Sequence, residues 1–153
     1  MKKHKFSCKR GGLTIRGNLF QPEGENLPIA ILSHGFMANQ STMKGYAQAA
    51  AELGFAAFTY DFCGGCLWGR SDGKTTDMSV LTEVEDLKAV IAYASSLSFT
   101  DESRIVLIGA SQGGFVSALT AAQMGNKIER LVLFYPALCI PDDARKGQMM
   151  FAK

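Results

Sequence analysis

The spacing of hydrophobic residues changes along the chain, and these changes separate predicted strands from predicted helices. Two short segments on either side of Gly11 and Gly12 predict a pair of strands joined in a hairpin. Four further segments are almost continuously apolar, which is typical of strands buried on both faces. In chain order, the six predicted strands are FSCKR, LTIRGNLF, PIAILSH, FAAFTYDF, RIVLIGA and RLVLFYPA.

Apolar residues at helical spacing lie between the later strands. The first helix is predicted over 43–53, with Gly54 at the position of a C-cap glycine, and the third over 115–124, closed by Gly125. The second has a predicted inner face of Val80, Leu81, Val84, Leu87, Val90, Ile91 and Ala94. A hairpin followed by alternating strands and helices indicates an α/β fold, with a mainly parallel sheet and helices on both faces.

The predicted sheet places a candidate site at one of its edges. Ligands bind sheets of this type beyond the carboxyl ends of the strands. His34, the loop after Asp61, Ser111 and the segment after Pro136 all follow predicted strands. We therefore expect these four segments to meet at one edge and to form the site.

Length, charge and composition narrow the class of protein. The 153 residues fit a single domain, 1–153, and the net charge of +2 gives no indication of a nucleic-acid partner. No apolar stretch reaches the roughly 18 residues of a membrane span, and the N-terminal segment lacks the apolar core of a signal peptide. We predict a cytoplasmic location without membrane contact, where the four cysteines stay reduced.

The segment GASQGG joins a predicted buried strand to a predicted helix, with Ser111 between Gly109 and Gly113. A dinucleotide-binding turn would need glycine where Ser111 stands, so that motif fails. Two interpretations remain. One is a plain strand-to-helix connection, and the other is a nucleophile elbow, in which a sharp and strained turn exposes the serine hydroxyl. The position between a buried strand and a helix favours the elbow.

The segment HGF supplies the second half of such a site. An acyl-transfer site needs two backbone N–H donors for the oxyanion of the intermediate. One comes from the residue after the nucleophile, here Gln112, and the other from the loop after the third strand. Phe36, directly after His34 and Gly35, occupies that second position.

These motifs together resemble the α/β-hydrolase superfamily along the whole chain. HGF, the loop from DF to SDG, and GASQGG follow the third, fourth and fifth predicted strands in the order of that superfamily. SDGK combined with SQGGF is most similar to small bacterial carboxylic-ester hydrolases, including the cinnamoyl or feruloyl esterase group. The loop CGGCLWGR departs from the short turn that such enzymes more often carry.

The resemblance implies a serine hydrolase that cleaves a small-molecule ester through an acyl-enzyme on Ser111. The N–H groups of Phe36 and Gln112 would form the oxyanion hole, and no cofactor is implied. A peptidase of the prolyl-oligopeptidase type is the alternative enzyme. A non-catalytic α/β-hydrolase-like module that binds a ligand or partner is the alternative outside catalysis.

The catalytic base and its acid are not evident. The two histidines, His4 and His34, both precede Ser111, whereas the acid and histidine of this superfamily follow the serine on later loops. We expect His34 to shape the oxyanion loop and His4 to lie on the surface. Asp142 and Asp143 follow the last predicted strand, and we interpret them as the start of an insertion.

The sequence therefore predicts the N-terminal portion of a longer hydrolase. We expect the first six strands to be present, the strands that carry the acid and histidine to be missing, and this chain alone to be inactive. Without later neighbours, residues 131–135 would form an apolar edge strand. Such an edge favours self-association.

Two further motifs carry no predicted function. Cys63 and Cys66 have the spacing of a redox or metal pair, but the residues that follow indicate a loop, and Cys8 and Cys139 add no matching spacing. The overlapping GGCLWGRS approaches a phosphate-binding loop but has Arg70 in place of the lysine. We predict no metal site, and we expect Asp61 to anchor its loop by hydrogen bonds.

Overall fold

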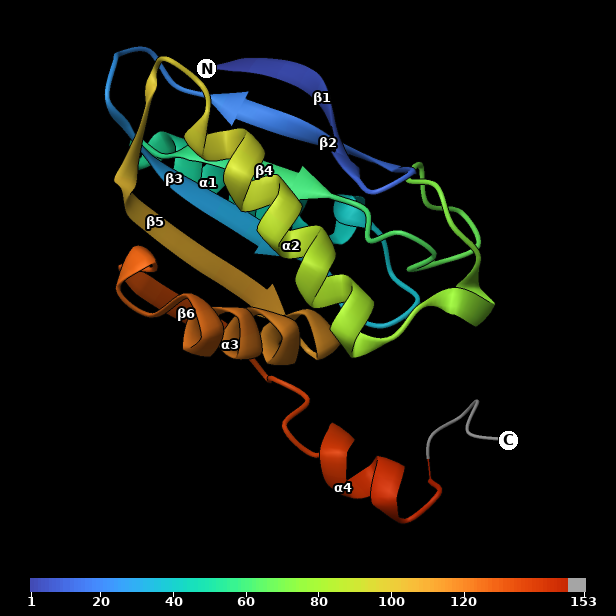
Figure 1. The fold of residues 1–153 in the computed structure, drawn as a ribbon. Helices are drawn as coiled ribbons and strands as arrows, with labels where there is room; N and C mark the ends of the chain where they lie inside the picture. The colour runs from blue at the N-terminus through green and yellow to red at the C-terminus, as the bar shows by residue number, and fades with distance from the viewer. Residues whose placement is uncertain (149–153) are drawn as a thin grey trace.

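The computed structural model describes residues 1–148, and its centre is one six-stranded sheet (Figure 1). The strands are β1 (Lys2–Arg10), β2 (Leu13–Gln21), β3 (Leu27–Ser33), β4 (Ala56–Tyr60), β5 (Thr100–Ala110) and β6 (Arg130–Phe134). Their order across the sheet is β1-β2-β4-β3-β5-β6. β1 and β2 form the predicted hairpin, β2 pairs antiparallel with β4, and the remaining pairs are parallel. The predicted mainly parallel α/β sheet is confirmed.

Helices cover both faces of the sheet. In Figure 1, α2 crosses in front of the sheet and α1 lies behind it, while α4 projects away from it. The helices are α1 (Lys44–Glu52), α2 (Val80–Ser95), α3 (Gln112–Met124) and α4 (Ile140–Arg145), and the short 3-10 turns are η1 (Gln40–Met43), η2 (Thr75–Asp77) and η3 (Gly125–Lys127). None of the helices within residues 1–148 is both long enough and apolar enough to cross a membrane.

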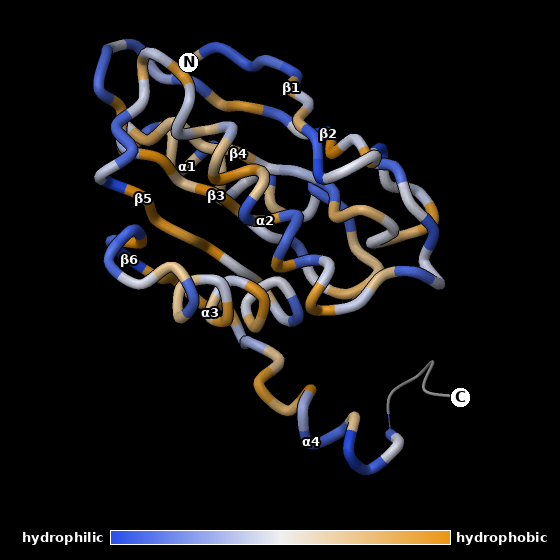
Figure 2. Tube along the Cα trace, in the orientation of Figure 1, coloured by the Kyte–Doolittle hydropathy of each residue, from blue (hydrophilic) through white to orange (hydrophobic). Residues whose placement is uncertain are grey.

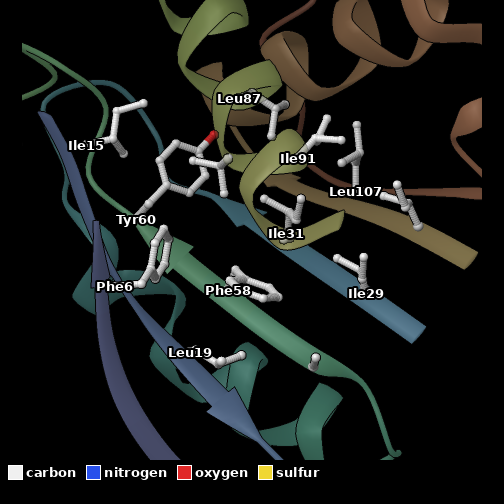
Figure 3. Close-up of a cluster of buried hydrophobic side chains, with 14 of the residues drawn as sticks. Phe6, Ile15, Leu19, Ile29, Ile31, Phe58, Tyr60, Leu87, Ile91 and Leu107 are labelled. Atoms are coloured by element: carbon white, nitrogen blue, oxygen red, sulfur yellow. The ribbon is translucent and has the colours of Figure 1, made fainter. Parts of the chain in front are cut away.

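The larger part of the core fills the space between the sheet and α2. Leu87 and Ile91 of α2 belong to the same buried cluster as Ile31 of β3, Phe58 of β4 and Leu107 of β5 (Figure 3). Figure 2 shows strongly hydrophobic stretches along β3 and β5, as expected of central strands covered on both faces. Burial of this kind holds the carboxyl ends of the strands in fixed positions.

A smaller cluster lies under α1 on the opposite face. Ala47, Ala50 and Ala51 of α1 are buried with Phe20 of β2 and Leu32 of β3. Because alanine side chains are small, α1 can lie close to the sheet. The helix ends at Glu52, and Gly54 follows it with a φ of +95°, as predicted for a glycine after a helix.

The predicted inner face of α2 is wrong at one position and incomplete at two others. Leu81 is 67% exposed, whereas Glu83 and Asp86 are buried. The buried stripe runs through Glu83, Asp86, Leu87 and Val90, and Leu81 is two residues, or about 200°, away from its first member. The helix therefore buries two carboxyl groups and leaves one leucine in solvent.

β6 is the outermost strand of the described sheet. It pairs with β5 alone among residues 1–148, and every residue of β6 is at least partly exposed. Leu131 and Val132 are 38% and 40% exposed, and Tyr135, which follows the strand, is 73% exposed. An apolar strand with unpaired backbone groups along one side therefore forms the sheet edge, at the predicted residues 131–135.

Candidate functional site

Ser111 occupies a strained turn between β5 and α3. Its φ of +53° and ψ of −121° are a conformation that residues with a side chain rarely adopt. Both backbone groups of Ser111 form hydrogen bonds. The Ser111 N–H donates to the carbonyl of Phe134 at 3.0 Å, and the Ser111 carbonyl accepts from the N–H groups of Gly114 and Ala137 at 3.0 and 2.9 Å. The surrounding structure thus holds the turn in its strained form.

The two glycines that flank Ser111 leave room for no side chain. A Cβ atom on Gly109 would lie 2.3 Å from the carbonyl oxygen of Gly113, and one on Gly113 would lie 2.3 Å from the carbonyl oxygen of His34. Both distances are far inside van der Waals contact, and both neighbours are backbone atoms. β5, α3 and the end of β3 therefore approach one another as closely as glycine allows.

The loops after β3, β5 and β6 meet at Ser111. A Cβ atom on Gly35 would lie 3.3 Å from the Cβ of Ser111, and one on Gly114 would lie 3.0 Å from the Cβ of Pro136. Phe36 and Gln112, the two predicted oxyanion donors, directly follow Gly35 and Ser111 in the chain. The structure thus brings the HGF and GASQGG segments together at the carboxyl edge of the sheet.

Helix α3 begins at Gln112, three residues earlier than the sequence pattern predicts. The pattern started the helix at its first large apolar residue, Phe115, whereas the backbone becomes helical directly after Ser111. The helix N-terminus therefore faces the elbow, where its free N–H groups favour negative charge. Gln112 itself is 6% exposed.

His34 is buried, and both of its ring nitrogens are engaged. The N–H of Phe62 donates to Nε2 at 3.2 Å, so Nδ1 carries the proton and donates to the carbonyl oxygen of Gly35 at 2.8 Å. Burial lowers the pKa of His34, which keeps the ring neutral. His34 therefore joins the loops after β3 and β4 and has no free nitrogen to take a proton from Ser111.

His4 is exposed on β1, the outer strand on the far side of the sheet. Three strands, β2, β4 and β3, lie between β1 and β5, which carries the elbow. Neither histidine of the chain is therefore placed to act as the base for Ser111.

Asp61 anchors the loop after β4, as the sequence indicated. Its carboxylate accepts hydrogen bonds from the N–H of Gln40 at 2.7 Å, from the Gln40 side chain at 2.9 Å and from the N–H of Arg70 at 2.9 Å. The same loop is bound to β2, since Ser71 accepts from the N–H of Arg16 at 2.9 Å. The Asp61 carboxylate is thus committed to the framework beside the site.

A buried carboxyl group next to the elbow was missed by the sequence reasoning. The side-chain amide of Gln112 donates to Oε2 of Glu83 on α2 at 2.8 Å, and Glu83 is 1% exposed. Burial raises the pKa of Glu83 to about 8, so it is mainly protonated at neutral pH. The signal that could have found it is helical spacing, since Glu83 stands four residues before Leu87 and seven before Val90 on the apolar stripe.

A second buried acid on α2 supports the loop that contains the cysteine pair. Asp86 forms an ion pair with Arg10 of β1, and its other oxygen accepts from the N–H of Cys63 at 2.8 Å. Burial raises the pKa of Cys63 to about 12, which leaves a poorly reactive thiol. Cys66 lies in the same loop, and both cysteines are free thiols. Within residues 1–148 no three His, Cys, Asp or Glu side chains gather to hold a metal ion.

Replacing Ser111 by glycine is expected to stabilise the fold. A strained φ costs about 1–3 kcal/mol, and glycine removes most of that cost while losing about 0.5–1 kcal/mol of chain entropy. We expect Ser111→Gly to raise the free energy of unfolding by about 1 kcal/mol, measured in denaturant. Ser111→Ala is the control because it keeps a Cβ at the same φ. Equal stability of the two variants would show that the turn stores no strain.

The chain is similar to several known proteins. Residues 24–153 match the family model described as "Serine aminopeptidase, S33". An Escherichia coli protein of 31.7 kDa from the traX-finO intergenic region is 36% identical over 104 residues, which is 67% of this chain and 35% of that protein. A monoacylglycerol lipase of Mycolicibacterium smegmatis is 28% identical over 144 residues, which is 94% of this chain and 50% of that protein.

One solved structure is similar to the chain in both fold and sequence. Est1E from Butyrivibrio proteoclasticus, determined with ferulic acid bound, superposes with a TM-score of 0.87 at 29% identity. The match covers 95% of this chain and 58% of Est1E. The chain thus spans about a third to somewhat over half of the length of the proteins it matches.

Proposed function

Because the chain belongs to the serine aminopeptidase S33 family of α/β-hydrolases, we propose that it carries the nucleophile and oxyanion donors of a serine hydrolase for carboxylic esters. The observation that carries the proposal is the turn at Ser111. A serine is held there at a φ of +53° between a buried strand and a helix, although glycine would relieve most of that strain. Strain of this kind clusters at active sites and ligand-binding sites.

In the proposed reaction, Oγ of Ser111 attacks the ester carbonyl carbon and gives up its proton to a histidine base. The carbonyl oxygen becomes negative and accepts hydrogen bonds from the N–H groups of Phe36 and Gln112. Loss of one such donor costs about 3–4 kcal/mol of transition-state stabilisation. The histidine then protonates the leaving alcohol, and water, activated by the same histidine, releases the acid from the acyl-enzyme.

We further propose that the base and its acid come from outside these 153 residues. His34 is bonded at both nitrogens, and His4 lies on the far edge of the sheet. The matched proteins are about two to three times as long as the matched segments. A continuation of the same polypeptide is the source we favour, and a second chain is the other.

Two relatives support an ester rather than an amide as substrate. The lipase's name refers to monoacylglycerol, and Est1E was solved with ferulic acid. Small esters of hydroxycinnamic acids or of glycerol are therefore the substrates to test first. The family description, an aminopeptidase, makes a peptidase the second candidate.

We also propose a cytoplasmic location, which the four free cysteines support.

The test uses the longest natural polypeptide that contains this chain. We expect labelling of Ser111 by a fluorophosphonate and hydrolysis of methyl ferulate, with slower or no cleavage of an aminoacyl anilide. Ser111→Ala should abolish both the labelling and the hydrolysis. Faster cleavage of the anilide would favour the peptidase. An absence of labelling, together with specific binding of a ligand, would favour a non-catalytic binding module.

The sheet edge formed by 131–135 leads us to propose self-association of the isolated chain. A lysine on an edge strand opposes edge-to-edge pairing. Val132→Lys should therefore shift the chain toward the monomer, measured by small-angle scattering or sedimentation. Leu81→Lys adds the same charge at an exposed position on α2 and should have no such effect. A monomeric unmodified chain would contradict the proposal.

A further inference from the structure

The side chain of Gln112 forms a hydrogen bond with α2. Its amide donates to Oε2 of Glu83 at 2.8 Å, and its amide nitrogen also lies 3.8 Å from the sulfur of Met78. Both Gln112 and Glu83 are buried. Gln112 is the first residue of α3 and directly follows the strained Ser111, so these side-chain contacts lie next to the elbow backbone.

We propose that Glu83 is a positioning residue for the reaction at Ser111. Its carboxyl group holds the Gln112 side chain, and through it the orientation of the Gln112 backbone N–H, which is the proposed oxyanion donor. This inference rests on the proposed serine-hydrolase function but adds a residue from a different helix. Glu83 does not touch the reacting atoms, and it acts through Gln112.

The charge of Glu83 gives this arrangement a pH dependence. The group is 1% exposed, and its burial raises its pKa to about 8. Below that pH the carboxyl is neutral and accepts the Gln112 hydrogen bond without placing a charge beside the elbow. Above it, a buried carboxylate next to Gln112 opposes the growth of negative charge on the substrate oxygen. Reactivity at Ser111 should therefore fall as the pH rises through 8.

The titratable and charged groups of the surrounding elements agree with this direction. Asp86 on the same helix raises the pKa of Glu83, whereas the Gln112 hydrogen bond lowers it, and burial outweighs both. Arg10 on β1 is bound to Asp86. Tyr60 on β4 is buried, and its hydroxyl lies 2.8 Å from that of Ser33. His34 is kept neutral by burial, Cys63 is a protonated thiol, and Cys8 on β1 has its pKa raised by burial to about 11. None of these neighbours neutralises an ionised Glu83 directly.

The first measurement is the rate of fluorophosphonate labelling at Ser111 in the longest natural polypeptide, between about pH 7 and pH 9. A group with a pKa of about 8 is about tenfold less protonated at pH 9 than at pH 7, so the rate should fall by up to about tenfold. Glu83→Gln keeps an oxygen acceptor for Gln112 but cannot ionise, and it should remove the fall. Glu83→Leu removes the acceptor and should slow labelling about tenfold to a hundredfold at every pH.

Glu85→Gln is the matched control. Glu85 lies on the same helix, is exposed and pairs with Lys88 at 3.1 Å. Its replacement should leave the fall above pH 8 unchanged. Thermal unfolding of each variant shows whether it still folds. A pH profile that is the same in the unmodified protein and in Glu83→Gln would overturn the inference, even if Ser111 labels rapidly.

A second readout is independent of the reaction. In the longest natural polypeptide, the NMR signals of the Gln112 backbone and side-chain N–H groups should shift with a midpoint near pH 8, and Glu83→Gln should abolish that shift. If Ser111 never labels but this titration is present, the proposed function fails while the contact between Glu83 and Gln112 stands. If the titration is absent, the inference fails.

Discussion

The 153-residue chain, prepared by itself, is expected to label with a fluorophosphonate at Ser111 about a million times more slowly than a complete serine hydrolase. Removal of the catalytic histidine costs about that factor in the best-studied serine case. Here the two ring nitrogens of His34 form hydrogen bonds with Phe62 and Gly35, and three strands lie between His4 and the strand that carries the elbow. Among residues 1–148, the hydroxyl of Ser111 thus has no histidine base, although its strained turn is present. The measurement is the rate of covalent modification, followed by mass spectrometry of the peptide that contains Ser111.

The labelling rate of the isolated chain is compared with that of a variant and with that of a longer polypeptide. Ser111→Ala sets the background from other nucleophiles, and the longest natural polypeptide sets the rate with a base present. Rapid and stoichiometric labelling of Ser111 in the isolated chain would show that a base is supplied within it or by a second copy. The proposal that the base comes from outside these 153 residues would then be wrong, while the proposal of Ser111 as the nucleophile would stand.

The succession of strands and helices along the chain and the tight turn at Ser111 could be predicted from sequence because their signals are local. An apolar run such as RIVLIGA indicates a strand from its own residues, and glycine at 109 and 113 indicates a close approach of backbone that the structure confirms. The hairpin at Gly11 and Gly12 is equally local, with Arg10 and Leu13 paired across the turn.

The partners of buried polar groups could not be predicted in this way. Helical spacing can place Glu83 on the buried stripe of α2, but only the packing of α2 against α3 brings it beside Gln112. The two bonds of His34 depend on the loop after β4 returning to the end of β3. Apolar spacing also misplaced Leu81, because it identified apolar residues rather than the stripe that α2 turns inward. These contacts are set by tertiary packing and have no short-range signature.

Replacing Gly113 is expected to cause a large loss of stability, because backbone atoms lie close to it. A Cβ atom there would lie 2.3 Å from the carbonyl oxygen of His34 and 2.4 Å from that of Ser33. Both obstacles are backbone atoms at the end of a central strand, so no side chain can rotate to make room. Gly113→Ala must therefore push α3 away from β3, and it should lower the free energy of unfolding by about 3 kcal/mol or more. Denaturant unfolding of the chain measures the loss.

Gly45→Ala is the matched substitution in a helix without a close neighbour. A Cβ atom on Gly45 would meet nothing within 4 Å, and the residue lies in α1, where alanine is favoured over glycine by up to about 1 kcal/mol. We expect Gly45→Ala to stabilise the chain slightly while Gly113→Ala destabilises it strongly. Because the chemical change is identical, opposite signs would assign the loss at 113 to the contact between elbow and strand. A similar small effect at both positions would mean that the elbow can relax, and that glycine at 113 is not required for the fold.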